Sequence, residues 1–534
     1  MMQTVIIGAG VAGLATAALL AREGHDVVVF EKNDRVGGRS GTLSREGFRF
    51  DTGPSWYLMP QVFEHFFEML GTSTEEQLDL RFVRPGYRVF SEPRPDGSCR
   101  EPLDIPLGRD RVIDAFWRIE PSSTPAIEAY LSSARRTNKI AERYFLYNPF
   151  TRLASLLRKE VIVGLPELVR LLTTSLESYV AKRFADPVLR QVLGYPAVFL
   201  GTNPADAPAM YHLMSALDLD EGVRYPMGGF WHLMERFEAL ARAAGARIVT
   251  NAEVLAIHTE RRTGRPRVRQ RREVTGVTVR EGGGGERFEA ADIVVSGADL
   301  HHTETRLLAS RDQSYSERWW SRRTSGPGAV IAMLGVRGEI PRLPHHSLFF
   351  TRDWAANFAA IFGEDPHIPE PASIYLCKPS ATDATVAPAG HENLFLLIPV
   401  PADPNIGKGS ISGKPSPRVE AAVDAAIDQI MEWAEIPDLR ERIVVRESLG
   451  PADFAHDYFS WQGGMLGPAH ILSQSAMFRA QNASKKVAGL YYAGATTAPG
   501  VGIPMCLISA ELVLKRIRRD HSAGPLPAPS RAVL

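Results

Sequence analysis

The stretch that decides the fold is Val5-Ile6-Ile7-Gly8-Ala9-Gly10-Val11-Ala12-Gly13-Leu14-Ala15-Thr16-Ala17-Ala18-Leu19-Leu20. It predicts a buried strand, a glycine turn and a helix rich in alanine and leucine. In such a turn Gly8 permits the tight bend, Gly10 lets the backbone approach a diphosphate, and Gly13 lets the helix pack closely on the strand. The N-terminus of the helix offers unpaired N–H groups and the positive end of its dipole to phosphate. The stretch therefore predicts a dinucleotide site.

A second predicted strand, residues 26–30, ends in an acidic residue at the position that such a site requires. Glu31 follows Gly13 by 18 residues, where a carboxylate can accept hydrogen bonds from a ribose diol. This context favours a nucleotide site over the alternative of a plain glycine-rich turn in an α/β domain.

The next residues select the dinucleotide. Residues 32–40 read KNDRVGGRS, and residues 50–54 read FDTGP. Paired glycines let a second loop approach the same diphosphate, and Arg39 offers a fork of donors to phosphate. A nicotinamide dehydrogenase does not need this second loop, whereas a tightly held FAD does. The segments 31–39 and 50–54 resemble the large group of FAD enzymes that includes amine oxidases and carotenoid desaturases.

The C-terminal part of the chain distinguishes these two groups. Residues 489–511 read GLYYAGATTAPGVGIPMCLISAE, which predicts an apolar strand over 490–493, a glycine-rich loop and a helix that begins near Gly502. Such a helix start can stabilise negative charge on a reduced flavin ring. Amine oxidases usually carry Gly-Glu where this chain has Gly494 and Ala495. The segment 499–504 instead resembles bacterial and fungal phytoene desaturases and their diapophytoene, isomerase and ketolase relatives.

Three further segments carry the same resemblance, which runs from about residue 4 to about residue 518: GPSWYLMP at 53–60, YPMGGF at 225–230 and LSQSAMFR at 472–479. The resemblance implies bound FAD, with an adenine contact through the backbone of Val254. The cofactor-binding residues that we expect are Gly8, Gly10, Gly13, Glu31, Lys32, Gly38, Arg39, Gly53, Pro54, Val254, Gly494, Gly502, Ile503 and Pro504.

The predicted fold class is α/β. We expect a Rossmann-type FAD-binding domain, assembled from the discontinuous segments 1–80, 216–300 and 468–520. A mixed-sheet substrate domain comprises 81–106 and 301–467. Residues 107–215 form a helical, membrane-docking region, and 521–534 are expected to be a flexible tail.

Composition narrows the function classes. The chain has 534 residues, of which 44% are hydrophobic, and its 61 acidic residues balance 61 basic ones. No overall field would draw it to nucleic acid. The three cysteines have no metal-ligand spacing and no disulfide pattern, which fits a reducing cytoplasm, and Cys506 is expected to pack rather than react. No run of roughly 20 apolar residues predicts a spanning helix, so we expect a protein that is not integral to a membrane.

One stretch is a candidate for membrane contact. Residues 151–184 interleave apolar residues with lysine and arginine, which suits a segment in the interface of an anionic bilayer. From the pattern alone, core helices with solvated basic faces are at least as good an interpretation; the resemblance favours docking, because a polyene hydrocarbon is collected from lipid. The second basic stretch, 261–272, has seven arginines and predicts a solvated hairpin loop, with acidic-lipid contact as the minority alternative. We expect a cytoplasmic location, peripheral to the inner face of the cell membrane.

The function that the resemblance implies is FAD-dependent desaturation of a linear carotenoid, phytoene to lycopene or to a partly desaturated intermediate, by hydride transfer from an allylic CH2 to flavin N5. A membrane quinone or oxygen would reoxidise the flavin, since no second nicotinamide fingerprint occurs. Alternatives are carotenoid isomerisation, ketolation or desaturation of diapophytoene or another carotenoid; an amine oxidase; and a lipid escort protein without flavin.

The sequence identifies no proton-accepting residue and predicts no metal site. His345 and His346, in a proline-bounded loop, are expected to be exposed and inert. The candidates for tunnel lining are apolar or aromatic, although each is more often plain core: Trp56, Tyr57, Phe199, Leu200, Tyr225, Phe230 and Trp461.

Overall fold

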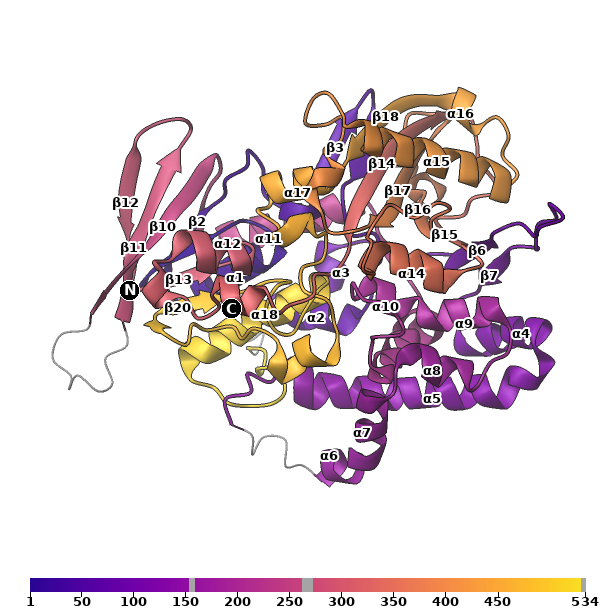
Figure 1. The fold of residues 1–534 in the computed structure, drawn as a ribbon. Coiled ribbons are helices and arrows are strands. Elements are labelled where there is room, and N and C mark those ends of the chain that lie inside the picture. Colours follow the sequence, from indigo (N-terminus) through magenta and orange to yellow (C-terminus); the bar gives the residue numbers. More distant parts are fainter. Residues whose placement is uncertain (153–158, 262–271, 530–534) are drawn as a thin grey trace.

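The computed structural model describes residues 1–152, 159–261 and 272–529. Its organising element is a five-stranded parallel sheet drawn from three distant parts of the chain (Figure 1). The strands in spatial order are β20 (Leu490–Tyr492), β13 (Ile293–Ser296), β1 (Gln3–Ile7), β2 (Asp26–Phe30) and β9 (Arg247–Val249). The N-terminal glycine motif and the C-terminal flavin-type segment therefore belong to one sheet.

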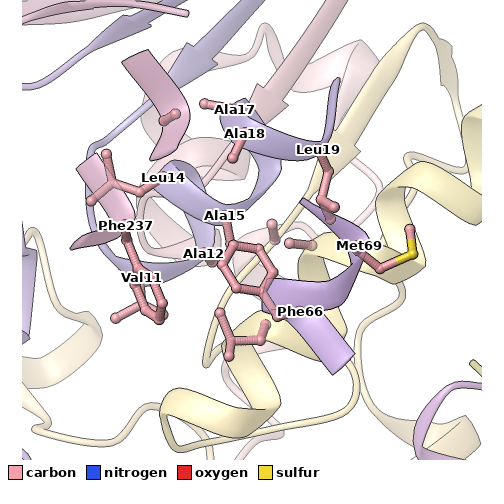
Figure 2. Close-up of a cluster of buried hydrophobic side chains, with 14 of the residues drawn as sticks. Val11, Ala12, Leu14, Ala15, Ala17, Ala18, Leu19, Phe66, Met69 and Phe237 are labelled. Carbon is pink, nitrogen blue, oxygen red and sulfur yellow. The ribbon is translucent and has the colours of Figure 1, made fainter. Parts of the chain in front are cut away.

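Helix α1 (Val11–Arg22) forms the centre of the core beside this sheet. Its residues 11–21 are all buried, because it packs against α18 (Ile503–Arg518), α11 (Gly229–Ala243) and the parallel strands. Figure 2 shows its small side chains meeting Phe66, Met69 and Phe237, of which the first two lie on α2 (Pro60–Met69). A helix that is apolar all round fits a buried position between other elements.

In the glycine turn before α1, backbone atoms pack more closely than side chains would allow. Gly8 has φ +89°, a conformation that glycine adopts readily. A Cβ added at Gly13 would lie 1.9 Å from the carbonyl oxygen of Gly8, so only glycine fits there without displacing the backbone. The assigned roles of a tight turn at Gly8 and a close helix–strand approach at Gly13 match this geometry.

A second sheet lies beside the first. It consists of β10 (Ala252–Arg261), β11 (Arg272–Glu281) and β12 (Glu286–Ala290) in antiparallel order, with β19 (Val487–Ala488) parallel to β11. The predicted basic hairpin loop joins β10 to β11, but its residues 262–271 lie outside the described part of the chain.

The third sheet is seven-stranded and mixed. In spatial order it contains β18 (Ile443–Leu449), β14 (Gly328–Arg337), β17 (His391–Val400), β16 (Ile374–Cys377), β15 (His346–Phe350), β6 (Tyr87–Ser91) and β7 (Leu103–Ile105). Helix α15 (Pro417–Trp433) covers one face. The other face packs on the helical region. Strands buried on both faces read as continuous apolar runs, as residues 329–334 and 394–398 do.

The helical region follows β7, as the sequence predicts (Figure 1). Its helices are α4 (Arg109–Ile119), α5 (Thr124–Ala141), α6 (Lys159–Val163), α7 (Leu165–Thr173), α8 (Leu176–Ala181), α9 (Pro187–Gly194) and α10 (Pro196–Phe199). Elsewhere lie α3 (Thr74–Gln77), α12 (Leu300–His302), α13 (Glu317–Trp320), α14 (Trp354–Phe362), α16 (Leu439–Arg442) and α17 (Pro451–Asp457). Two short strand pairs link the parts: β3 (Thr42–Arg45) with β4 (Phe48–Asp51), and β5 (Leu80–Phe82) with β8 (Arg224–Pro226).

The prediction of a flexible C-terminal tail is wrong for residues 521–529. Lys515 is fully buried, and its ammonium group donates to the carbonyl oxygens of Ser522 and Gly524, each at 2.7 Å. Leu526 is buried in the core around α1. A buried ammonium needs several acceptors, and the tail supplies two of them. Residues 530–534 lie outside the described chain.

Among the described residues, we find no helix with the length and apolar character that crossing a bilayer requires.

Replacing Gly13 by alanine is expected to lower the free energy of unfolding by about 1–3 kcal/mol, because the new methyl group must displace the Gly8 carbonyl. Gly10→Ala is the matched control, since a Cβ there meets nothing closer than 4.0 Å; its loss is expected to stay within about 1 kcal/mol. Urea unfolding of both variants prepared without flavin measures the difference. Equal losses of unfolding free energy in the two variants would contradict the close backbone approach assigned to Gly13.

Candidate functional site

The glycine turn at 8–13 and the loop at 494–504 line one cavity, of about 600 Å³. Pro504 and the other predicted cofactor-binding residues border it, with the exception of Gly13, which is buried beneath the turn. The two loops approach closely, since a Cβ at Gly494 would lie 3.7 Å from the Cβ of Ala12. Two segments almost five hundred residues apart thus form one site.

At one end of the cavity, the Glu31 carboxylate is fixed by the glycine turn. It accepts hydrogen bonds from the backbone N–H groups of Ala9 at 2.7 Å and Asn33 at 2.9 Å. Burial raises the pKa of Glu31, and these two donors act in the opposite direction. The carboxylate is therefore held at the end of β2, beside Val254 of β10, where a ribose and an adenine would lie.

The second glycine loop lies against the first. Gly37 donates its N–H to the carbonyl oxygen of Ala9 at 2.9 Å and pairs with Gly10. Arg39 lies over the Tyr458 ring and donates to Ser460, but its buried Nε has no hydrogen-bonding partner in the described part of the chain. An orphaned guanidinium N–H is costly without an acceptor, so it marks a place for an anionic ligand.

The C-terminal loop is held from behind by a buried arginine. Arg479 is 4% exposed, and it donates to four backbone carbonyl oxygens, those of Pro468, Gln474, Ala495 and Thr497. Among the described residues, no carboxylate pairs with it. Burial lowers the pKa of Arg479 to about 10, so the guanidinium stays charged at neutral pH. The loop is thus fixed over a positive charge.

These features fit a flavin dinucleotide. The α1 N-terminus and the space at Gly10 suit a diphosphate, and Glu31 suits a ribose. The start of α18 at Gly502 points its dipole into the same cavity. Cys506 also lines the cavity, but burial raises the pKa of its thiol to about 12, so it is uncharged and packs, as expected.

Beyond the loops the cavity continues as an apolar tunnel. Leu168 and Leu172 of α7 line one part of it, and Ile331 and Leu397 of the seven-stranded sheet line another. Of the predicted tunnel residues, Trp56, Phe199 and Leu200 line the cavity. The others pack in the surrounding core: Tyr57, Tyr225, Phe230 and Trp461.

The sheet end of the tunnel contains a polar group of side chains. The Tyr375 hydroxyl lies 2.6 Å from Ser55 Oγ and 2.8 Å from His346 Nδ1. Trp56 stacks on the His346 ring, with centroids 4.9 Å apart. Ser55, Trp56 and Tyr375 line the cavity, so its wall includes hydrogen-bonded polar groups as well as hydrocarbon.

The expectation that His345 and His346 are exposed is wrong. Both are buried, because β15 lies inside the third sheet between β16 and β6. Burial lowers the pKa of His345 to about 3 and that of His346 well below its usual range, so both rings are neutral.

These two rings and Cys377 form a cluster that sequence spacing did not reveal. His346 pairs directly with Cys377 across β15 and β16, and ligand-type atoms of His345, His346 and Cys377 lie within 4.8 Å of one another. The cluster arises from strand pairing, which no local cysteine spacing encodes.

Sequence reasoning also missed two buried polar residues at the cavity. His470 lines it, and Arg479 fixes its loop. Arg479 lies in the segment 472–479 that carried the family resemblance, and His470 lies two residues before that segment. No local pattern marks them, because the contacts that tie them to the site are remote in sequence: Leu200 for His470, and Ala495 and Thr497 for Arg479.

A buried acid lies behind the tunnel. Asp218 accepts a hydrogen bond from Tyr87 at 3.2 Å, and the Tyr87 ring packs on Trp56. Burial raises the pKa of Asp218 to about 7. Because the unfolded chain releases this proton near the ordinary pKa, folding stability is expected to fall as pH rises from about 4 to about 7.

Asp218→Asn should therefore raise the free energy of unfolding at about pH 8 by ~1–3 kcal/mol and flatten its pH dependence. Asp220→Asn is the control. Asp220 pairs with Arg135 at 2.6 Å, so its replacement should destabilise the protein. Urea unfolding of both variants from about pH 4 to about pH 8 measures these changes. A loss of stability in Asp218→Asn at pH 8 would contradict a protonated Asp218.

Comparison with known proteins identifies the family. The model of the flavin containing amine oxidoreductase family matches residues 11–517. A carotenoid 3,4-desaturase of Haloarcula japonica is 36% identical, with 96% of this chain and 98% of the relative covered. A zeta-carotene-forming phytoene desaturase of Myxococcus xanthus is 33% identical, with 99% and 96% covered.

Among solved structures, a putrescine oxidase bound to putrescine has a TM-score of 0.58 at 14% identity, covering 97% of this chain and 99% of that one. Such a likeness shows the fold alone. The family match and the two sequence relatives show that this chain belongs to the flavin-containing amine oxidoreductase family, among its carotenoid desaturases.

Proposed function

We propose that this protein holds FAD and desaturates a linear carotenoid, with phytoene as substrate and lycopene or a partly desaturated intermediate as product. The observation that carries the proposal is the shared cavity, in which two glycine loops of dinucleotide-binding type continue into an apolar tunnel. Bound FAD would supply the hydride acceptor for an allylic CH2 group.

Different residues of the chain would bind the cofactor and position the substrate. Glu31 would hold the ribose and Arg39 the diphosphate, while Gly494, Gly502 and Pro504 would border the flavin ring. Trp56, Phe199 and Leu200 would fix the polyene and exclude water. Orienting an unreactive C–H bond is the main contribution a protein can make to such a reaction.

Other activities are less well supported. Ala495 stands where amine oxidases usually carry glutamate, which disfavours an amine substrate. The ribose acid Glu31 and the glycines of both loops are all present, which disfavours a lipid escort without flavin. Carotenoid isomerisation, ketolation and desaturation of another carotenoid use the same kind of tunnel and are outcomes of the test below.

Two apolar segments at the tunnel support membrane docking. On α6 and α7, exposed apolar side chains accompany the tunnel residues Leu168 and Leu172: Ile162, Val163, Leu165 and Val169. In Figure 1 these helices project from the lower edge of the helical region. Leu472, Met477 and Phe478 are exposed and also border the cavity.

We therefore propose that both apolar segments enter the bilayer surface, so that a carotenoid passes from lipid into the tunnel. Within the predicted membrane-docking segment 151–184, Val161 is buried, and Leu156 and Leu157 lie outside the described residues. Peripheral attachment to the inner face of the cell membrane and reoxidation by a membrane quinone or by oxygen complete the proposal.

Purified protein with FAD, given phytoene in liposomes and a quinone or oxygen, is expected to form coloured polyenes, and phytoene is expected to bleach the flavin in the absence of oxygen. Chromatography identifies the product. Gly10→Ala, which places a methyl group against the diphosphate, should weaken FAD retention by about tenfold or more. If phytoene is unchanged but another carotenoid is converted, that other carotenoid is the substrate. A protein that cannot bind FAD would overturn the proposal.

The double variant Ile162→Glu, Val163→Glu should weaken liposome binding by about tenfold or more, because each substitution removes an apolar side chain worth roughly 1.5–3 kcal/mol when buried. Phe288→Glu is the matched control, since Phe288 is equally exposed but lies on β12 in another sheet. Flotation with liposomes measures both. If the double variant floats as well as the control, α6 is not a membrane contact.

A further inference from the structure

The buried cluster of His345, His346 and Cys377 belongs neither to the flavin site nor to the tunnel wall. The three residues are 3%, 0% and 1% exposed, and none of them lines the cavity. One ligand-type atom from each lies within 4.8 Å of the other two. Two imidazoles and a thiol are donors that thiophilic metal ions prefer. The cluster is therefore a candidate metal site separate from the cavity.

Pairing of β15 with β16 brings the three residues together. His346 lies directly opposite Cys377 in the antiparallel ladder. The ring of His345 meets that of His346 edge-on, with centroids 4.4 Å apart. The carbonyl oxygen of His345 accepts a hydrogen bond from the N–H of Lys378 at 2.7 Å. Backbone pairing thus holds the three side chains in place, and a site built on strands is positioned more precisely than one on loops.

One nitrogen of each ring already has a partner. Nδ1 of His345 lies 2.7 Å from Thr382 Oγ1, and Nδ1 of His346 lies 2.8 Å from the Tyr375 hydroxyl. In metal-ligating histidines, a hydrogen bond at the other ring nitrogen orients the ring and fixes its tautomer. With the proton on Nδ1, each ring donates to its hydroxyl partner, and Nε2 carries the lone pair.

The two Nε2 atoms are buried, and neither has a hydrogen-bonding partner in the described part of the chain. Buried polar atoms without a partner are rare in native proteins, and each requires an explanation. The Cys377 thiol has a single hydrogen, so it can satisfy at most one of the two lone pairs. A metal ion would satisfy both lone pairs and would replace that hydrogen. The two nitrogens and the sulfur therefore point to a bound cation.

We propose that His345, His346 and Cys377 bind one copper(I) ion as its three ligands. The thiol proton of Cys377 passes to solvent as the copper–sulfur bond forms, and copper stays in the +1 state, so no electron is transferred. The thiolate and the ion cancel in charge, which suits a buried position, where a net charge is costly. Burial raises the pKa of the thiol, so it is uncharged without metal; a coordinated thiol loses its proton outright.

Zinc fits this cluster less well. A zinc ion in proteins usually has four ligands, and sites with three protein ligands add water, whereas this cluster offers three groups, all buried. Zn²⁺ with one thiolate would also keep a net positive charge, close to the buried Lys378 that interacts with His345. The nearby acids Asp51 and Asp383 instead accept hydrogen bonds from backbone N–H groups of residues 228–231.

Anaerobic titration of the purified flavoprotein with copper(I), in competition with a chromophoric copper(I) chelator, is expected to show uptake of one equivalent. Cys377→Ser keeps the size of the side chain but removes the thiolate, so it should weaken copper(I) binding by about 100-fold or more. Cys99→Ser is the matched control, because Cys99 is partly exposed and lies outside the cluster; its affinity should stay within about threefold. Flavin content and circular dichroism check that both variants fold.

X-ray absorption at the copper edge of the loaded, unsubstituted protein is independent of any variant. It should show copper(I) with one sulfur and two nitrogen neighbours, and equimolar Zn²⁺ should not displace the copper. The proposal would be overturned by failure to take up one equivalent, by unchanged affinity in Cys377→Ser, by a copper site without sulfur, or by preferential retention of zinc.

Discussion

Two backbone segments meet at the glycine turn more closely than any side chain would allow. With a hydrogen in place of a Cβ at Gly13, α1 starts directly against the Gly8 carbonyl. This contact sets the direction in which the N-terminus of α1 points. Because α18 packs along α1, it also sets where the C-terminal loop can lie. The position of the cavity follows from that contact, since each of its glycine-bearing walls is anchored to α1.

Local sequence patterns were sufficient to predict the elements whose conformation depends on neighbouring residues in the chain. The strand–turn–helix unit, the acid at Glu31 and the helix that begins after Gly502 follow from glycine spacing and apolar runs, and the structure has each of them within a residue or two. The resemblance added the pairing of the two chain ends, which no period in the sequence could supply. The glycines among the predicted cofactor-binding residues could be listed from the sequence because local backbone conformation selects glycine at a tight turn.

The failures have one physical cause. His345 and His346 look like loop residues beside Pro344, yet pairing of β15 with strands from residues 87–91 and 374–377 buries them. The tail was predicted to be flexible, and it is rich in proline, yet Lys515 donates hydrogen bonds to its carbonyl oxygens. In both cases the deciding partner is remote in sequence. His470 and Arg479 escaped notice for the same reason, since the groups that fix them lie in other segments.

The charges around the cavity have a consistent arrangement. Arg479 is a buried cation, and the partners that it has among the described residues are backbone carbonyl oxygens rather than carboxylates. Such a cation disfavours any second positive charge nearby and favours a negative one. A group in the cavity that gains electrons would therefore be stabilised from the loop side, while His470 is kept free of a proton in the resting state. The apolar lining of the cavity strengthens both effects, because apolar surroundings screen charge poorly. One buried guanidinium thus fixes the C-terminal loop and favours negative charge in the cavity that this loop borders.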